Sequence, residues 1–409
     1  MEQRQKQKRA IFYKHRPDYL ITVLVFFLVG VGLMLIYSTG WIAVLKRTSG
    51  VSETNSFFIT QLIGMAVGVI GWWGASKLDY HNWQKYATPI FIASIVIMLL
   101  VLIPGLAVSS GGATRWVKLG FIGFQPVEFF KIATIIFMAA WLAKHKKSLA
   151  RPPRGLLPFL IIISVVALLV VIIQRDMGSA MVIASTILVM YFVSGAPWWS
   201  TGIATLALAG GAGMLALLAP YRIARLMTYL NQSEDIAGTG YHINQSLIAI
   251  GSGGLLGRGP GKSLQAYGYL PEATNDSIFA IIGEEFGLLG TSLIIVAFSL
   301  LFWRGVRIAK SAPDDFGRLL ATGIIFWISF QALINISAML SLMPLTGITL
   351  PFISYGGTSI LALLLAVGIL QNISKYTYKE VYDEDPSGRR RNSRAHITGT
   401  GRHRINSQT

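Results

Sequence analysis

The stretch YLPEATNDSIFAIIGEEFGLLG, residues 269–290, decides the fold class because a polar, acidic segment runs directly into an apolar helix. Glu272 and Asp276 lie in the polar segment, whereas Glu284 and Glu285 lie within the apolar run. An ionisable side chain inside a bilayer costs on the order of several kcal/mol unless it is partnered or faces a wet cavity, so such residues are functional candidates. The stretch therefore predicts a polar site embedded in a membrane protein.

The composition of the whole chain agrees with a membrane protein. Of 409 residues, 53% are hydrophobic and 13% are charged, and the mean hydropathy is +0.57. A helix of about 20 apolar residues crosses the ~30 Å of bilayer hydrocarbon. Ten such runs lie near 19–39, 57–76, 87–107, 124–143, 156–173, 178–194, 199–219, 277–302, 319–341 and 355–373. We predict an all-α polytopic membrane protein with about ten transmembrane helices.

The net charge of +17 is explained by membrane topology rather than by nucleic-acid binding. Of the 35 Lys and Arg residues, 25 fall in segments on one side of the ten spans, 9 fall in loops on the other side, and Lys131 is embedded. The positive-inside rule makes the richer side cytoplasmic. Both termini are therefore expected in the cytoplasm, and a large loop between the seventh and eighth helices, residues 220–276, is expected outside.

This topology divides the chain into three parts. Residues 1–18 form a basic cytoplasmic N-terminus, residues 19–373 form the membrane domain, and residues 374–409 form a basic cytoplasmic tail. The end of the tail is rich in Gly, Ser and Arg and has almost no apolar content, so we expect the tail to be disordered.

The large outer loop combines an amphipathic stretch, HINQSLIAI from His242, with a glycine run, GSGGLLGRGPGKS from Gly251. We expect the first to be a helix at the membrane interface. The glycine run is not a nucleotide-binding loop, because Leu256 occupies the first glycine position and no strand precedes it. Arg258 and Lys262 are expected either to neutralise a lipid-linked phosphate or to form a solvated basic turn.

The fourth span and the loop before it contain further charged residues, in GGATRWVKLGFIGFQPVEFFKIA from Gly111. Glu128 and Lys131 are three residues apart on one helix face, which predicts a structural ion pair. Arg115 and Lys118 lie in the outer loop, where they could bind an anionic substrate. Arg115 beside Trp116 is equally typical of a membrane anchor.

Two other outer turns supply candidate site residues. Asp176 lies in the turn QRDMG from Gln174, where a charged pair alone would also explain the turn. Tyr355 lies in LMPLTGITLPFISYGGTS from Leu342, whose prolines and hydroxyls are typical of a kinked segment that lines a cavity.

Three long motifs resemble the SEDS family (shape, elongation, division and sporulation) of polytopic glycan polymerases. They begin at Gly111, Ile248 and Ile334, and read GGATRWVKLGFIGFQPVEFFKIA, IAIGSGGLLGRGPGKSLQAYGYLPEATNDSIFAIIGEEFG and INISAMLSLMPLTGITLPFISYGGTS. The resemblance covers about residues 12–376. The forms YLPEA and GITLPFISYGG are more similar to the division and sporulation branch, typified by FtsW, than to the elongation branch, typified by RodA.

The resemblance implies that the chain polymerises lipid II into glycan strands on the outer face of the bacterial cytoplasmic membrane, for septal wall synthesis. It places the catalytic aspartate at Asp276, with Glu272 among the substrate-binding residues. The family's usual HTDF is replaced by Thr274 to Ser277, and its QPDLG by QRDMG, so the acid is kept while its neighbours differ. The implied partners are lipid II, the nascent strand, a class B penicillin-binding transpeptidase and other division proteins of the membrane.

Two other functions remain open from the residues alone. The embedded charges could line a path that moves lipid-linked precursor across the bilayer, or the chain could be a non-enzymatic scaffold for division proteins. No obligatory cofactor is expected. Asp276, Glu272 and Asp176 could supply oxygen ligands to Mg²⁺ or Mn²⁺, although no dedicated ligand spacing is present.

Overall fold

The computed structural model describes residues 8–46, 52–103, 105–110, 113–119, 122–149, 155–217, 223, 227, 229 and 240–382. Most of the first part of the large outer loop and the tail from residue 383 lie outside this set. The expected disorder of residues 383–409 therefore stays a prediction.

All ten expected spans coincide with helices in the described part of the chain. They are α1 (Tyr19–Lys46), α2 (Ser52–Lys77), α4 (Ala87–Leu99, continued by a 3-10 turn, Leu100–Leu102), α5 (Pro126–Leu149), α6 (Leu156–Ile173), α7 (Met177–Val193), α8 (Trp198–Leu217), α11 (Ile278–Ser311), α12 (Asp315–Met339) and α13 (Gly357–Ile373). Six of these contain a stretch long and apolar enough to cross a membrane. The prediction of an all-α multi-pass membrane protein is confirmed.

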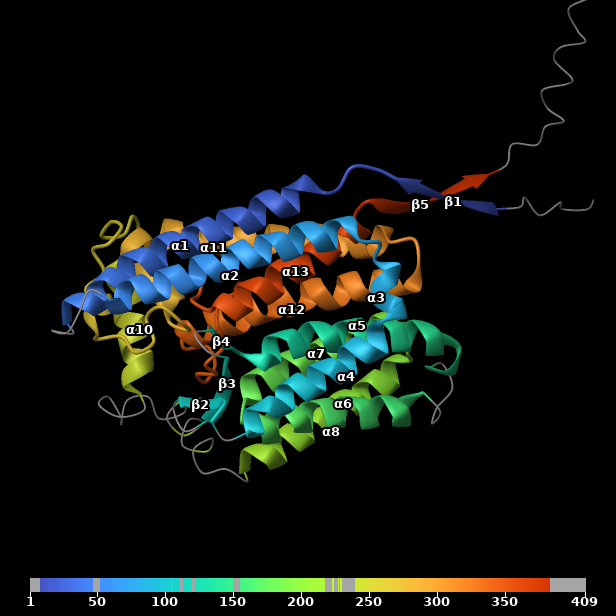
Figure 1. Ribbon diagram of the computed structural model, residues 1–409, viewed down its shortest axis with the longest axis horizontal. Helices are drawn as coiled ribbons and strands as arrows, with labels where there is room; N and C mark the ends of the chain where they lie inside the picture. The colour runs from blue at the N-terminus through green and yellow to red at the C-terminus, as the bar shows by residue number, and fades with distance from the viewer. Residues whose placement is uncertain are drawn as a thin grey trace, which may run out of the picture.

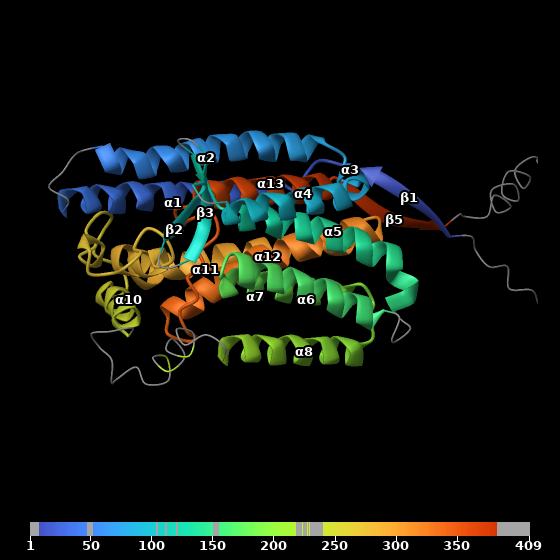
Figure 2. The same ribbon diagram turned by 60° about the horizontal axis from the view of Figure 1, so that its bottom comes forward.

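The helices form one bundle with α5 and α12 at its centre. Figure 1 shows α12 between the α2 and α13 pair and the group formed by α4 to α8, and Figure 2 shows α8 as an outer helix. In the most apolar windows of α5 and α12, 72% of the residues are buried, against 22–39% in α1, α2, α6 and α11. These windows of α5 and α12 are therefore surrounded mainly by protein.

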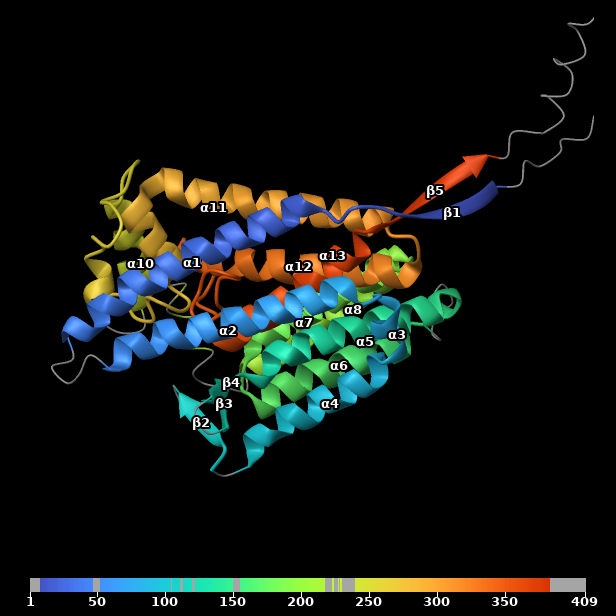
Figure 3. The same ribbon diagram turned by 45° about the horizontal axis from the view of Figure 1, so that its top comes forward.

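The two ends of the bundle carry different structures. At one end lie the short helix α3 (His81–Lys85) and two paired strands, β1 (Lys8–Lys14) and β5 (Tyr376–Tyr382). At the other end lie α10 (Tyr241–Ser252) and a small sheet, as Figures 1 and 3 show. The strands nearest the two termini thus share one end, and the described part of the large loop lies at the opposite end, as the expected topology requires.

The tail begins with a strand, so the expectation of disorder from residue 374 is wrong for residues 376–382. β5 pairs antiparallel with β1, from Lys14 opposite Tyr376 to Lys8 opposite Tyr382. The sequence YTYKEVY is rich in tyrosine and includes Thr and Val, residue types that favour strands. The prediction of disorder was based on the polar composition of the end of the tail, which does not apply to residues 376–382.

A second feature that the sequence did not predict is a three-stranded antiparallel sheet before α5. Its strands are β2 (Ala107–Ser110), β3 (Ala113–Leu119) and β4 (Ile122–Phe124), in that order across the sheet. The sheet joins α4 to α5 and lies at the same end as α10.

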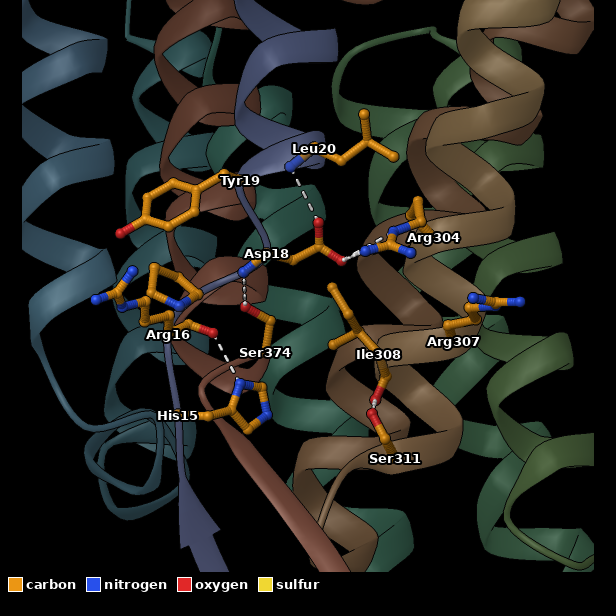
Figure 4. A pocket seen from close by; sticks show the side chains of 11 residues that line it. His15, Arg16, Asp18, Tyr19, Leu20, Arg304, Arg307, Ile308, Ser311 and Ser374 are labelled. Carbon is orange, nitrogen blue, oxygen red and sulfur yellow. Dashed lines mark hydrogen bonds and ion pairs between the residues drawn. The ribbon is translucent and has the colours of Figure 1, made fainter.

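A cavity of about 380 Å³ lies where α1, α11 and α13 meet beside β1 and β5. Asp18 fills its centre: its Oδ2 is 2.8 Å from Nη2 of Arg304, and its N–H donates to Ser374 Oγ at 3.0 Å. Figure 4 shows Arg16 and Arg307 extending to opposite sides. Asp18 neutralises Arg304 on α11 and bonds Ser374 at the end of α13. These two contacts hold the start of α1 to both helices.

Candidate active site at the start of α11

The loop before α11 is a tight turn that places Asp276 at the outer end of the bundle. The N–H groups of Asn275 and Ser277 donate to the carbonyl of Glu272, at 2.9 and 3.2 Å, and Ser277 Oγ donates to the Pro271 carbonyl at 2.8 Å. Glu272 is exposed and has a φ of 49°, in the left-handed region that few non-glycine residues adopt. Asp276 itself is half-buried.

A second loop, between α12 and α13, packs against this turn. The Tyr355 N–H donates to the Thr274 carbonyl at 2.9 Å. A Cβ placed on Gly347 would lie 3.9 Å from Oδ2 of Asp276, so the two loops approach closely at the carboxylate. The structure therefore brings Asp276, Glu272 and Tyr355 into one cluster of loops.

The N-cap position of α11 is Ser277, which makes no side-chain cap hydrogen bond. The Asp276 carboxylate is thus one residue before the N-cap position. The dipole of a helix stabilises negative charge near its N-terminus.

Glu284 anchors the large loop to α11 from within the bundle. Its side chain is buried and accepts hydrogen bonds from Ser263 Oγ at 2.5 Å, the Leu264 N–H at 2.9 Å and the Gln265 N–H at 3.2 Å. Nη1 of Arg258 lies 3.5 Å from Glu284 Oε1. Arg258 is therefore paired with Glu284, while Lys262 is exposed.

The helical conformation of α11 is interrupted at Gly287, and backbone groups of the glycine run bond to the interrupted part. Gly287 has φ 63° and ψ −158°, which interrupts the helical hydrogen bonds. In compensation, the Gly259 N–H donates to the Glu285 carbonyl at 2.9 Å, and the Leu288 N–H donates to the Gly254 carbonyl at 2.9 Å. Non-helical backbone at membrane depth is tolerated only where protein satisfies it in this way.

α10 packs directly on α11, and its expected position at the membrane interface stays a prediction. Ile243, Ser246 and Ala249 on α10 are buried, and Ile250 contacts Gly283 on α11. Leu247 on the same helix stays 38% exposed, while small residues on both helices let the two backbones approach closely.

Gly253→Ala tests this close approach. A Cβ at residue 253 would lie 1.9 Å from the Gly283 carbonyl oxygen, so α10 must move away from α11. We expect a loss of about 1–3 kcal/mol in unfolding free energy, the usual cost of overpacking, measured by thermal unfolding of the purified protein. Gly251→Ala is the matched control because nothing lies within 4 Å of its Cβ position. Equal stability of the two variants would contradict the packing.

Arg115 contacts the turn between α6 and α7 that contains Asp176. Nη2 of Arg115 donates to the Arg175 carbonyl at 3.1 Å. Asp176 is the N-cap of α7, where its Oδ1 accepts the Ser179 N–H at 3.0 Å. These contacts fix the turn against β3, and substrate binding by either residue stays a prediction. The side chain of Lys118 lies outside the described set.

The expected ion pair on α5 is present and buried. Nζ of Lys131 lies 2.8 Å from Oε1 of Glu128, and both side chains are at most 5% exposed. Lys131 Nζ also donates to Gln331 Oε1 on α12 at 3.0 Å, and Ser359 Oγ on α13 donates to Glu128 Oε2 at 3.3 Å. The pair thus joins three helices.

Two buried amides on α12, Gln331 and Asn335, were not singled out from the sequence. Gln331 Nε2 donates to the Thr349 carbonyl at 3.0 Å, and Asn335 Nδ2 lies 2.7 Å from the carbonyl oxygens of both Asp276 and Ile348. The available signal was their spacing, since amides at i and i+4 in an apolar span share one face. They connect the central helices to both site loops.

Among the described residues, no group of three or more Asp, Glu or His side chains could hold a metal ion. Any ion at Asp276 would need most of its ligands from substrate phosphate and water.

Comparison with known proteins identifies the family. The sequence model of the family of FtsW, RodA and SpoVE cell cycle proteins matches residues 18–379. Stage V sporulation protein E of Bacillus subtilis is 40% identical over 368 residues, which cover 89% of this chain and 98% of that protein. A probable peptidoglycan glycosyltransferase FtsW of Geobacter sulfurreducens is 37% identical over 361 residues, 88% of this chain and 95% of the relative.

Solved structures share the fold. A chain of a peptidoglycan synthase complex, described as coordinating polymerization and crosslinking, matches with a TM-score of 0.69 and 24% identity over 88% of this chain and 98% of its own. The rod shape determining protein RodA of Thermus thermophilus matches with a TM-score of 0.62 and 24% identity, over 88% of this chain and 97% of its own. The chain is a multi-pass membrane protein that belongs to the FtsW, RodA and SpoVE family of cell cycle proteins.

Proposed function

We propose that this protein is a peptidoglycan glycosyltransferase that polymerises lipid II on the outer face of the bacterial cytoplasmic membrane, for the wall made at division. The single observation that carries the proposal is the position of Asp276. Asp276 is half-buried as a residue, with its Oδ1 covered by protein, at the end of the bundle away from β1 and β5 and in a turn fixed by main-chain hydrogen bonds. The FtsW and sporulation relatives support the substrate class and the role in division.

The reaction needs one base and a cationic environment for the leaving group. Asp276 takes the proton from the C4 hydroxyl of the acceptor N-acetylglucosamine as that oxygen attacks C1 of the donor N-acetylmuramic acid. The bond from C1 to the pyrophosphate oxygen breaks, and undecaprenyl pyrophosphate leaves with the electron pair. One displacement of this kind inverts an α-linked donor to a β-linked glycan, and the pyrophosphate needs no acid to leave.

The cations of the outer end are the candidates for binding the pyrophosphate. Lys262 is exposed and Arg258 is about one-third exposed, and Arg115 lies on the neighbouring sheet. We propose a class B penicillin-binding transpeptidase as the partner that crosslinks the strands, in line with the synthase complex that shares this fold. We also propose for test that Asp276 would be a ligand of a bound Mg²⁺ or Mn²⁺, which would supply positive charge for the leaving pyrophosphate.

Purified protein in detergent, given labelled lipid II alone, tests the function. Glycan strands on a gel are the expected product. In parallel liposomes, movement of lipid II between leaflets without polymer would instead indicate a transporter, and neither result would indicate a scaffold. The same assay with and without a chelator decides the metal requirement.

A further inference from the structure

We infer that Asn335 positions the proposed base, Asp276, by holding its main chain to the central helix α12; this inference rests on the proposed function. Asn335 is 1% exposed, and its Nδ2 lies 2.7 Å from the Asp276 carbonyl and 2.7 Å from the Ile348 carbonyl. An amide NH₂ has two donors, one for each carbonyl. A single side chain therefore ties both site loops to the bundle.

The two loops form one unit at the carboxylate. Tyr355 donates its N–H to the Thr274 carbonyl at 2.9 Å, which is a second link between the loops. The close approach of Gly347 to Oδ2 of Asp276 places the loop from α12 to α13 beside the reacting oxygens. A shift of either loop therefore changes the position of the Asp276 carboxylate relative to the other loop.

Asn335 is attached to a rigid support. One helical turn earlier, Gln331 donates to the Thr349 carbonyl, and its Oε1 accepts from Lys131 Nζ at 3.0 Å and Trp327 Nε1 at 2.9 Å. The loop residues Ile348 and Thr349 are thus fixed by two amides on successive turns of a buried helix. The Gln331 amide uses both its oxygen and its NH₂ group in these contacts, and a buried polar group that is satisfied in this way specifies one geometry.

The consequence for the reaction is geometric, because Asn335 acts through the main chain of Asp276. A misplacement of about 1 Å at a reacting group costs on the order of 10²-fold in rate. Asn335→Leu removes both donors without introducing a charge. We expect kcat to fall by about 10²-fold while KM changes little, since the loss is in the orientation of the base.

Asn372 on α13 is a matched control at the opposite end of the bundle. It is 2% exposed, its Oδ1 accepts the Tyr80 N–H at 3.0 Å, and its Nδ2 donates to the Ser76 carbonyl at 2.8 Å. Asn372→Leu removes a similar pair of buried hydrogen bonds far from Asp276. We expect it to lower thermal stability as much as Asn335→Leu, with kcat within about twofold of the wild type, since it does not move the reacting groups.

Hydrogen exchange supplies a readout that does not depend on activity. Asn335→Leu should speed exchange at the amides of Asn275, Ser277 and Tyr355, whereas Asn372→Leu should speed it at Tyr80. If Asn335→Leu does not fold, the pair Asn335→Ser and Asn372→Ser carries the same comparison. A hydroxyl keeps one donor, so a smaller loss of kcat is expected.

Equal kcat losses for the two asparagine variants, or no loss for Asn335→Leu, would overturn the inference while leaving the function intact. A wild-type protein that makes no glycan would overturn the proposed function. Exchange would then decide the structural part of the inference: unchanged protection of residues 275–277 in Asn335→Leu would refute it, and selective loss would support it.

Discussion

Asp276→Asn is expected to lower the rate of glycan polymerisation by about 10² to 10⁴-fold, the usual contribution of a positioned general base. The amide has nearly the same shape as the carboxylate but cannot accept the proton of the attacking hydroxyl. The main-chain contacts of residue 276, including the bond from Asn335, do not depend on its side chain. Stability should therefore stay near that of the wild type, and the defect should appear in kcat of the lipid II assay.

Glu272→Gln is the comparison for this result because it removes the other acid of the same turn. Glu272 is exposed, and its Oε2 accepts from Asn275 Nδ2. We expect a loss well below that of Asp276→Asn. An Asp276→Asn protein that melts like the wild type and polymerises within a few-fold of it would reject Asp276 as the base.

Lys131→Met is expected to lower the unfolding free energy by about 3–5 kcal/mol, because it leaves Glu128 as an uncompensated buried charge. Lys131 Nζ is the only cation within 4 Å of Glu128 in the described part of the chain. Gln331 keeps Trp327 as a donor to its Oε1, so the cost comes mainly from Glu128. Thermal unfolding of the purified protein measures the effect.

A double variant and a surface variant make this prediction specific. Glu128→Leu with Lys131→Met replaces the pair by apolar side chains and should recover most of the lost stability. Lys146→Met breaks the ion pair between Lys146 and Asp315, in which the Lys146 side chain is 50% exposed and the Asp315 side chain is 34% exposed. We expect it to lower the unfolding free energy by only about 0–1 kcal/mol. If the double variant is as unstable as Lys131→Met alone, a stranded charge is not the cause.

The ten spans could be predicted from the sequence because lipid contact imposes a strong local signal. Each span is a continuous apolar run, and even α5 keeps that signal while carrying Glu128 and Lys131. The distribution of Lys and Arg predicts the sidedness of the loops, which stays a prediction. Both properties depend on residues close together in the chain, which a sequence displays directly.

The parts that could not be predicted depend on partners far away in the chain. Asn335 contacts carbonyls 59 and 13 residues away. Glu284 binds a segment 19 to 21 residues earlier. The break at Gly287 is stabilised only when the glycine run lies against it. No local sequence pattern predicts such pairings. The acidic residues of the candidate site were therefore found from motifs, whereas the residues that hold them in place were not.

The pairing of β1 with β5 has a consequence for biogenesis. Lys8 leaves the ribosome before any helix of the bundle, and its partner Tyr382 leaves only after α13 has been made. β1 therefore stays unpaired while the helices are being made. Its pairing with β5 is a late step of assembly. A chain that ends before residue 376 would therefore leave the strand Lys8–Lys14 without its partner and open to proteases.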